Sequence, residues 1–394
     1  MSTLFKYTCT IPLALALASL PAFAQDSRAE MIAQLQAERA QQLEPNLPSN
    51  MEKALDWVEG YFTDPNTAYL TFGGVYPSAG FAPGIAVRRT IGRGRFTAGA
   101  AYSVRAYKSG YATLGFPELA GDHIEIHTHL KWTDATQVPF YGVGNDSLED
   151  DRVNYGLRML DAGGGISLKP VRWFRIGGAL ALQQIEDRGG DVSRASIETF
   201  PGPVPGLSTD TSYRQTSVFT AIDWREASGY TRRGGLYSIA LHDFNDSGNP
   251  LSFRRIDAEV QQMLPVLKEH WVLAFRGFVQ TTDADDGQVV PYYLLPRLGG
   301  SSRHRGYSDF RFQDRHMLLL SGEYRWTPSR VLDMAIFVDA GKVTHDRADL
   351  DFDGLKTAYG IGARIHGPNF TPVRLDVAHG KEGFRVHITG GVGF

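Results

Sequence analysis

The sequence has a single cysteine, Cys9, among its 394 residues. Without a second thiol, the chain can form no internal disulfide, no iron–sulfur cluster and no zinc site built from several thiolates. Long apolar runs are also scarce: no stretch of about 18 apolar residues follows Leu20, which excludes an ordinary transmembrane helix. The formal net charge of −3 lacks the positive excess expected of a protein that binds nucleic acid.

From Thr67 onward, apolar and polar residues alternate. In residues 95–107 the even positions, from Phe96 to Val104, are apolar or small, whereas Arg95 and Arg105 occupy odd positions. A period of two predicts β-strands with one apolar and one polar face. The pattern returns at 123–131, 151–167, 171–186, 213–224, 234–246, 251–264 and 269–282. We expect an all-β protein, a transmembrane antiparallel β-barrel over residues 67–394 whose polar faces line the lumen.

The pattern predicts fifteen or sixteen strands. The ambiguity lies between Tyr107 and Asp122, where residues 111–116 either form a strand or do not. Single-chain bacterial barrels have an even number of strands. Five tryptophans lie near proposed strand ends, as in the aromatic girdles of barrels: Trp132, Trp173, Trp224, Trp271 and Trp326. A soluble β-sandwich is the alternative fold, but it does not explain aromatic strand ends combined with charged inner faces.

A long loop rich in glycine, serine and arginine spans residues 283–313. Two alternating segments follow it, 317–326 and 331–343, and their polar faces carry Glu323 and Asp339. A guanidinium offers a planar fork of donors and keeps its charge, so Arg305 in a loop folded into the lumen can pair with both acids. Gly306 would let the loop backbone approach the wall. Unrelated charges on solvated surfaces are the simpler alternative.

Three short motifs together resemble the last third of the BamA, TamA and FhaC family of outer-membrane barrels. They are Arg305-Gly306-Tyr307, Gly322-Glu323-Tyr324-Arg325 and Phe337-Val338-Asp339-Ala340-Gly341. In that family an Arg-Gly-Phe/Tyr motif of the sixth extracellular loop lies inside the barrel and faces acids on the next two strands. The resemblance implies sixteen strands and a lumen latch formed by Arg305, Gly306, Tyr307, Glu323 and Asp339.

The N-terminal region departs from the family pattern. Residues 1–24 resemble a secretory signal peptide, with Lys6, an apolar core at 11–20 and the cleavage site Ala22-Phe23-Ala24. Residues 25–66 predict a periplasmic linker with one short amphipathic helix at 51–62. Assembly factors of the family carry POTRA domains here, and these residues are too few for one such domain. A helix that docks a partner is the alternative interpretation.

The end of the chain predicts a terminal strand with one apolar face. That face carries Phe384, Val386, Ile388, Val392 and Phe394, while Arg385 and His387 lie on the other. A terminal aromatic residue that closes an alternating strand resembles the sorting signal that outer-membrane barrels present to their insertion machinery.

Residues that suggest metal or catalytic chemistry are few, and we expect no cofactor and no catalytic site. His127 and His129 share a strand face, but same-face neighbours lie nearly 7 Å apart, so a polar lumen wall is the simpler interpretation. Asp349, Asp351 and Asp353 copy the start of a calcium loop, yet Gly360 stands where the bidentate glutamate is needed. No Gly-x-Ser-x-Gly elbow indicates a hydrolase.

Taken together, the sequence predicts a barrel in the cell outer membrane. We expect it to insert or translocate polypeptide or to handle lipid there, and not to be an enzyme. A passive porin-like channel is the first alternative, and an outer-membrane hydrolase is the second. The expected partners are outer-membrane lipid, the barrel insertion machinery and a separate periplasmic protein, but no nucleic acid.

Overall fold

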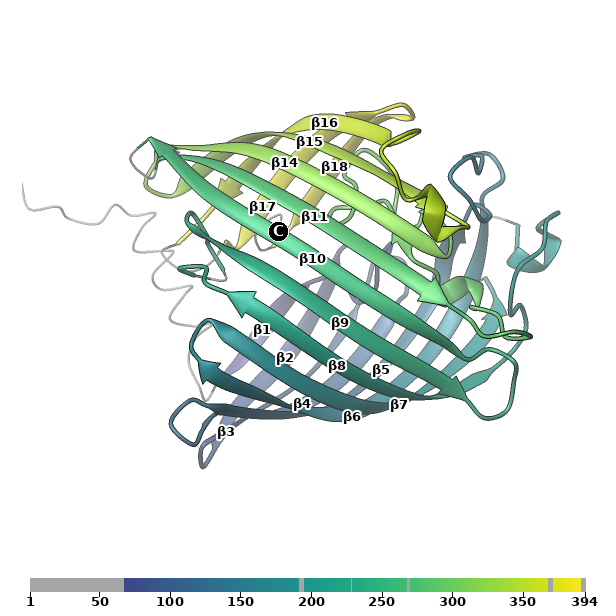
Figure 1. Ribbon diagram of the computed structural model, residues 1–394, viewed down its shortest axis with the longest axis horizontal. Helices are drawn as coiled ribbons and strands as arrows, with labels where there is room; N and C mark the ends of the chain where they lie inside the picture. The colour runs from purple at the N-terminus through teal and green to yellow at the C-terminus, as the bar shows by residue number, and fades with distance from the viewer. Residues whose placement is uncertain (1–66, 191–194, 228, 268–269, 368–370, 391–394) are drawn as a thin grey trace, which may run out of the picture. The chain divides into compact units, whose positions relative to one another are not determined.

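Sixteen antiparallel strands form one continuous sheet, in which the strands follow one another in the order in which they occur along the chain (Figure 1). The computed structural model describes residues 67–190, 195–227, 229–267, 270–367 and 371–390. The predicted signal peptide (1–24), the predicted linker (25–66), Val392 and Phe394 lie outside the described residues. The prediction of an all-β, sixteen-strand barrel is confirmed.

The strands of this sheet are β1 (Ala68–Gly73), β2 (Ala82–Ile91), β3 (Gly94–Tyr102), β4 (Lys108–Leu119), β5 (Ile124–Phe140), β6 (Val153–Val171), β7 (Phe174–Gly189), β8 (Thr211–Asp223), β9 (Gly234–Asp246), β10 (Phe253–Leu267), β11 (Trp271–Asp283), β14 (His316–Ser329), β15 (Leu332–Thr344), β16 (Lys356–Ile365), β17 (Val373–Gly380) and β18 (Gly383–Thr389). A separate two-stranded sheet pairs β12 (Arg297–Leu298) with β13 (Phe312–Gln313) inside the loop between β11 and β14. The short 3-10 helices are η1 (Ile197–Thr199), η2 (Tyr292–Leu294) and η3 (Arg347–Asp349).

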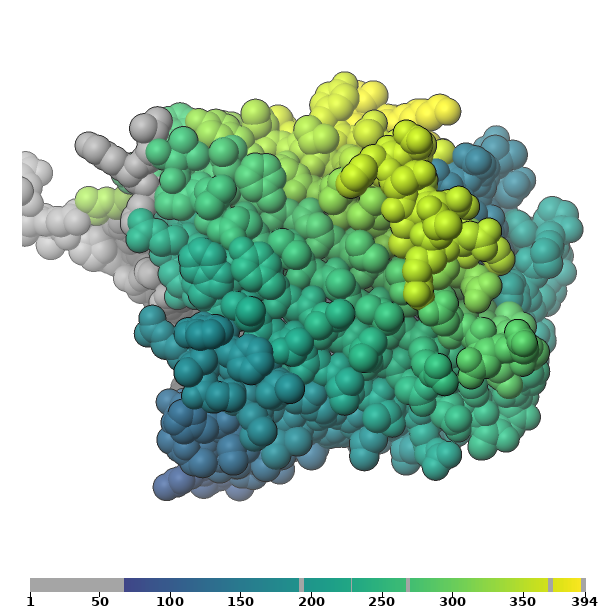
Figure 2. All heavy atoms as spheres, in the orientation of Figure 1, coloured from purple at the N-terminus to yellow at the C-terminus, as the bar shows by residue number. Residues whose placement is uncertain are grey.

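Alternation along each strand sets which side chains face outward. On β15, Ile336 and Val338 are half exposed, whereas Asp333 and Asp339 on the opposite face are buried. The outer surface is therefore apolar along the strands, as lipid contact demands, and the side chains of β8–β11 close over the front face of the barrel (Figure 2). Within the described residues, no helix is both long enough and apolar enough to span a membrane.

The two ends of the barrel differ. At one end, here called the turn end, consecutive strands join through short turns such as 92–93, 172–173 and 330–331. At the other, the loop end, lie longer connections, of which 284–315 is the longest in the described residues. The largest buried apolar cluster lies at the loop end, where Tyr107, Tyr155, Tyr213, Tyr292 and Phe310 belong to it. Packed loops, rather than the strands alone, therefore form the core.

Several details differ from the sequence prediction. The stretch between Tyr107 and Asp122 contains a strand, β4, because residues 108–115 pair with both β3 and β5. The strand expected over 95–107 ends at Tyr102, since Ala106 has a φ of 62° and the chain turns there. Trp132 lies inside β5, opposite Gly110, and not at a strand end. The segment expected over 317–326 is longer, because β14 runs from His316 to Ser329.

Candidate functional site

The loop between β11 and β14, residues 284–315 (the lumen loop), folds back into the barrel. Two glycines make its sharp return possible: Gly299 and Gly300 have φ values of 113° and 90°. A Cβ on Gly299 would lie 1.9 Å from the carbonyl oxygen of Ser308, so no other residue fits there. The Gly300 N–H donates to the carbonyl of Tyr307 at 2.9 Å and closes the tip of the loop.

Arg305 at this tip binds the two acids that the sequence singled out. Its Nε and Nη2 donate to the two carboxylate oxygens of Asp339 at 2.8 and 2.7 Å, and its backbone N–H donates to Asp339 at 3.0 Å. Its Nη1 donates to Glu323. The Arg305 side chain is 4% exposed and that of Glu323 is fully buried. The structure thus brings together the three charges whose pairing the resemblance implied.

Glu323 is shared by three arginines. Besides Arg305, Arg325 on the same strand and Arg364 on β16 donate to its Oε2 at 2.6 and 2.7 Å. A further acid, Asp376 on β17, lies 3.8 Å from Arg305 and 3.0 Å from Arg374. Sequence reasoning missed Arg364, Arg374 and Asp376. The alternation of β16 and β17 places all three on the polar face, but only the register shows that they meet under the loop.

The face of the Arg305 guanidinium also rests on an aromatic ring. Its Cζ lies 3.4 Å from the ring centroid of Phe337 on β15, within the range of a cation–π contact. A Cβ at Gly360 on β16 would lie 2.4 Å from this ring, so the missing side chain at Gly360 makes room for it. Burial alone would lower the pKa of Arg305, but the carboxylates of Glu323 and Asp339 outweigh it and raise that pKa above its usual value.

The next two residues of the motif seat the loop against the wall. A Cβ on Gly306 would lie 2.2 Å from the Cβ of Ala358 on β16, so only glycine allows this approach. Tyr307 is buried in a cluster with Leu298, Phe312 and other apolar side chains of β11, β14 and β15. Gly306 therefore allows the loop backbone to lie close to the wall, and Tyr307 packs against apolar side chains of the wall and the loop.

The lumen loop also bonds to both edges of the sheet. His387 on β18 contacts the Arg305 carbonyl through Nε2 at 2.8 Å. Next to the other edge, the N–H of Ser78, in the loop between β1 and β2, donates to Asp309 at 3.1 Å. Arg311 donates to Glu382, between β17 and β18, at 2.6 Å. β1 and β18 are the two ends of the strand order, so the loop contacts elements on both sides of the seam between these two strands.

A chain of polar side chains runs from the loop around the opposite wall. Successive contacts of 2.8–3.5 Å join inward-facing residues of β5 to β11 and end on a loop arginine. The members are His129, Asp161, Gln183, Gln215, Ser217, His242, Asp257, Gln280 and Arg303. Arg303 is the member of this polar belt that belongs to the lumen loop, and several other members remain partly exposed.

The weak metal candidates have other partners or neighbours. His129 binds Asp161 at 2.9 Å, and the rings of His127 and His129 lie against Gly165 and Gly163 of β6. Asp351 and the carbonyl of Asp353 accept from the Lys342 ammonium at 2.7 and 2.8 Å, while Asp349 ends η3. In the described part of the chain no group of three or more His, Cys, Asp or Glu side chains is placed to hold a metal.

The described part of the predicted sorting strand is β18. Its outward face carries Phe384, Val386 and Ile388, each more than 60% exposed. His387 and Arg385, on the other face, contact the lumen loop and Glu149 respectively. The apolar face and the loop-binding face of this strand are thus separate.

Comparisons with known proteins agree with this architecture. A family model described as the Omp85 superfamily domain matches residues 192–390. BamA from Haemophilus ducreyi lacking POTRA domains 1–3 is similar in fold, with a TM-score of 0.63 and 14% identity over 83% of this chain and 70% of that one. CdiB from Escherichia coli has a TM-score of 0.58 and 14% identity, over 82% of this chain and 61% of its own.

CdiB from Acinetobacter baumannii has a TM-score of 0.50 and 12% identity, over 82% of this chain and 58% of its own. Identities this low show a shared fold and no more. A comparison with curated protein sequences finds no match. The family model nevertheless covers about half of the chain, and the barrel shares the fold of BamA. The chain therefore belongs to the Omp85 superfamily of outer-membrane β-barrels.

Proposed function

We propose that this protein inserts polypeptide into the outer membrane or translocates it across. The observation that carries the proposal is the latched lumen loop of an Omp85-superfamily barrel: its tip is bound by acids of β14 and β15, and the loop also bonds to β18 and to the connection after β1. When the first and last strands of a sheet separate, their N–H and C=O groups become a template for another strand. A client strand pairing at these edges is the chemistry that the geometry favours.

The lengths of the edge strands support this proposal. Within the described residues β1 has 6 residues and β18 has 7, whereas β6 has 19. Short strands can form only short ladders with few hydrogen bonds, so separating β1 from β18 should cost less than separating a pair of long strands. The similarity in fold to BamA and CdiB is consistent with this role. Lipid handling at the same seam is the variant of the proposal.

Two further parts of the proposal concern how the protein reaches the membrane. Residues 1–24 direct export, and the terminal strand from Phe384 to Phe394 is recognised by the barrel insertion machinery. Deleting Phe394 should lower the amount of folded barrel in the outer membrane while leaving signal cleavage intact. Equal amounts of folded barrel with and without Phe394 would refute this part. A separate periplasmic partner would be recovered by crosslinking in cells.

The test of the main proposal is client insertion into vesicles. Phospholipid vesicles that contain the refolded chain are mixed with an urea-unfolded eight-strand barrel, and folding of the client is followed by its heat-modifiable gel mobility. We expect the client to fold several-fold faster than in empty vesicles. Vesicles that contain an unrelated sixteen-strand porin are the control. Equal rates in all three preparations would refute polypeptide insertion.

The same vesicles separate the alternatives. A porin function predicts rapid release of a trapped small solute by the intact chain, whereas a lipid-handling function predicts transfer of labelled lipid without client folding. The plugged lumen argues against free solute passage, because Arg305 and its neighbours hold the loop inside.

One observation favours a second candidate function, hydrolysis. Within the polar belt, Ser217 Oγ lies 2.8 Å from His242 Nδ1, and His242 Nε2 lies 3.5 Å from Asp257. A serine, a histidine and an acid in this order are the parts of an acyl-transfer triad. The second distance is at the limit of a hydrogen bond. Labelling of the refolded chain by a fluorophosphonate, lost in Ser217→Ala, would establish this function, and no labelling would exclude it.

A further inference from the structure

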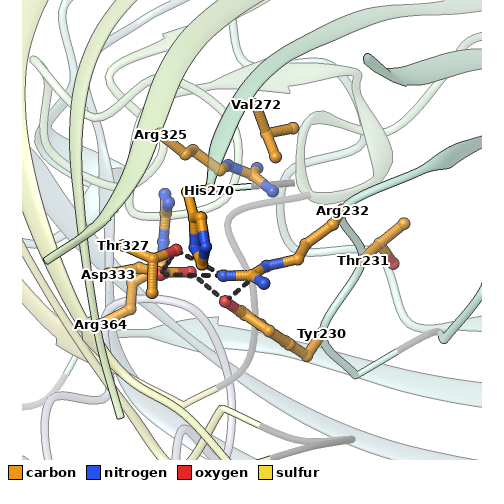
Figure 3. A pocket seen from close by; sticks show the side chains of 9 residues that line it. All are labelled: Tyr230, Thr231, Arg232, His270, Val272, Arg325, Thr327, Asp333 and Arg364. Atoms are coloured by element: carbon orange, nitrogen blue, oxygen red, sulfur yellow. Dashed lines mark hydrogen bonds and ion pairs between the residues drawn. The ribbon is translucent and has the colours of Figure 1, made fainter. Parts of the chain in front are cut away.

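One connection at the turn end is unlike its neighbours. The turns 92–93, 172–173 and 330–331 have two residues each, whereas the connection between β8 and β9 is longer, and part of it contacts strands that are not its neighbours in the sheet. Its described residues 229–232 contact the ends of β14, β15 and β16 (Figure 3). In the sheet, β9, β10, β11 and β14 separate this connection from β15.

Tyr230 is the central contact. Its hydroxyl donates to Asp333 on β15 at 2.7 Å and lies 3.1 Å from Nε2 of His366, just after β16. The rings of Tyr230 and His366 stack with centroids 3.9 Å apart and an angle of 11°. Asp333 and His366 are both buried. This combination of a charged hydrogen bond and ring stacking is a specific contact between distant parts of the wall.

Residues close to Tyr230 in the chain make further bonds to the same part of the wall. Arg232 donates from Nε to the Tyr230 hydroxyl at 3.0 Å and from Nη2 to Thr327 on β14. Thr327 in turn donates to Asp333 at 2.6 Å. The carbonyl of Gly229 accepts from Thr371, just before β17, at 3.2 Å. The segment is therefore bonded to three separate positions on the far wall.

The geometry places this segment on a chord of the barrel. Asp333 lies on the inward face of β15, the face that also carries Asp339. Neighbouring strands are about 4.8 Å apart, so the path along the wall from β9 to β15 is roughly 20 Å. Contacts at hydrogen-bond distance across such an interval require the segment to pass through the lumen side and not along the wall.

The same contacts lie directly beneath the latch. Tyr230, Arg232 and Asp333 line a small cavity of about 10 Å³ together with Arg325 and Arg364. Those two arginines donate to Glu323, which also binds Arg305 of the lumen loop. The two arginines that bind Glu323 at the latch therefore also line the cavity beside Tyr230, Arg232 and Asp333 (Figure 3).

We propose that residues 229–232 are a brace that fixes the curvature of the wall from β9 to β16. An arc closed by a chord cannot flatten or bend without breaking the chord, so this part of the barrel moves as a unit. Widening of the barrel is then confined to β17, β18, β1 and the strands that follow, where the seam lies. The importance of the brace for activity rests on the proposed function, but its mechanical role does not.

The test measures the width of the braced arc. Spin labels on Ile222→Cys and Ile365→Cys, in a Cys9→Ser background, lie on the outward faces near the turn ends of β8 and β16, where both native side chains are exposed. Pulsed electron paramagnetic resonance on the refolded barrel should give a narrow distance distribution in the parent protein. Tyr230→Ala should broaden it at least twofold, and Tyr230→Phe, which keeps the stacked ring, should broaden it less.

Arg93→Ala is the matched control, because Arg93 is an exposed residue in the turn between β2 and β3 at the same end. It should leave the distribution unchanged, and heat-modifiable mobility establishes that every variant has folded. Equal widths in the parent and in Tyr230→Ala would overturn the brace. If the distribution broadens while the intact parent fails to accelerate client folding, the brace stands and the proposed function fails.

Discussion

The two sides of the lumen wall carry similar residue types but place them in different surroundings. On β14 to β17 the inward charges Glu323, Asp339, Arg364 and Asp376 are buried beneath the lumen loop. On β5 and β6 the inward pairs His129–Asp161 and Lys169–Glu125 keep between 22% and 31% of their side chains exposed. Inward charge is therefore common to the whole barrel, and burial by the loop is what distinguishes the candidate site.

This difference in burial changes how much free energy is lost when an ion pair is broken. A pair in contact with water contributes between about 0 and 1 kcal/mol, because solvent screens it and ordering the side chains costs entropy. Removing one partner from a buried pair costs about 3–5 kcal/mol, because the remaining charge is left without compensation. Matched substitutions on the two sides should therefore differ strongly in their effect on stability. Four experiments test the contacts that bury the charges beneath the loop.

Removing the loop tip should have the largest effect. Deletion of residues 299–312 takes away Arg305 and the apolar contacts of Tyr307, and it should convert a plugged lumen into an aqueous channel. We expect small, fluctuating conductance in a planar bilayer from the intact protein, and conductance at least several-fold larger and steadier from the deletion. Removal of residues 348–352, in the loop between β15 and β16, is the control. Large, steady conductance from the intact protein would contradict the plug.

Arg305→Ala tests the buried pair itself. Asp339 then loses its bidentate partner, whereas Glu323 keeps Arg325 and Arg364. We expect docking of the loop to become less favourable by about 3–5 kcal/mol, so that residues 284–315 become sensitive to protease in the folded barrel.

The control on the other side is Glu125→Ala, which breaks the Lys169 pair of 2.9 Å. It should change stability by less than about 1 kcal/mol. A double-mutant cycle between Arg305 and Asp339 measures their coupling directly. Zero coupling, or equal effects of Arg305→Ala and Glu125→Ala, would remove the distinction between the two sides.

Gly306→Ala tests the close approach of the loop to the wall. The added Cβ would lie 2.2 Å from the Cβ of Ala358, and the resulting strain should weaken docking by about 1–3 kcal/mol. Ala358→Gly in the same chain should restore protease resistance. Gly110→Ala on β4 is the control, because its Cβ would meet nothing within 4 Å. Failure of Ala358→Gly to rescue would show that contact at Gly306 is not the cause.

The smallest effect concerns Asp309. Burial raises the pKa of this carboxyl above its usual value, so its ionised form opposes docking of the loop. The destabilisation is absent below the ordinary pKa of an aspartic acid, grows as the pH rises through the raised pKa, and stays constant above it. Asp309→Asn should therefore make the loop more protease-resistant at pH 7, with a difference that shrinks towards pH 4. A difference independent of pH would assign the effect to another cause.

The sequence predicted the strands well because alternation is a local property. Residues 213–224 and 234–246, for example, correspond closely to β8 and β9. Arg305, Glu323 and Asp339 were found through a family resemblance. The other partners could not be found in this way, since Arg364, Asp376 and Tyr230 are ordinary members of strands or turns. Which inward residues meet depends on the register of non-neighbouring strands and on the path of a connection through the lumen, and neither has a local signal.

The order of the latch residues along the chain has a consequence for assembly. Every side chain that binds the tip at Arg305, from Glu323 and Asp339 to Asp376 and His387, follows it in the sequence. A partly synthesised or partly inserted chain that ends before β17 cannot complete these contacts. The lumen loop therefore docks late, only once the final strands are in place. In a truncated barrel the loop stays undocked and accessible to proteases.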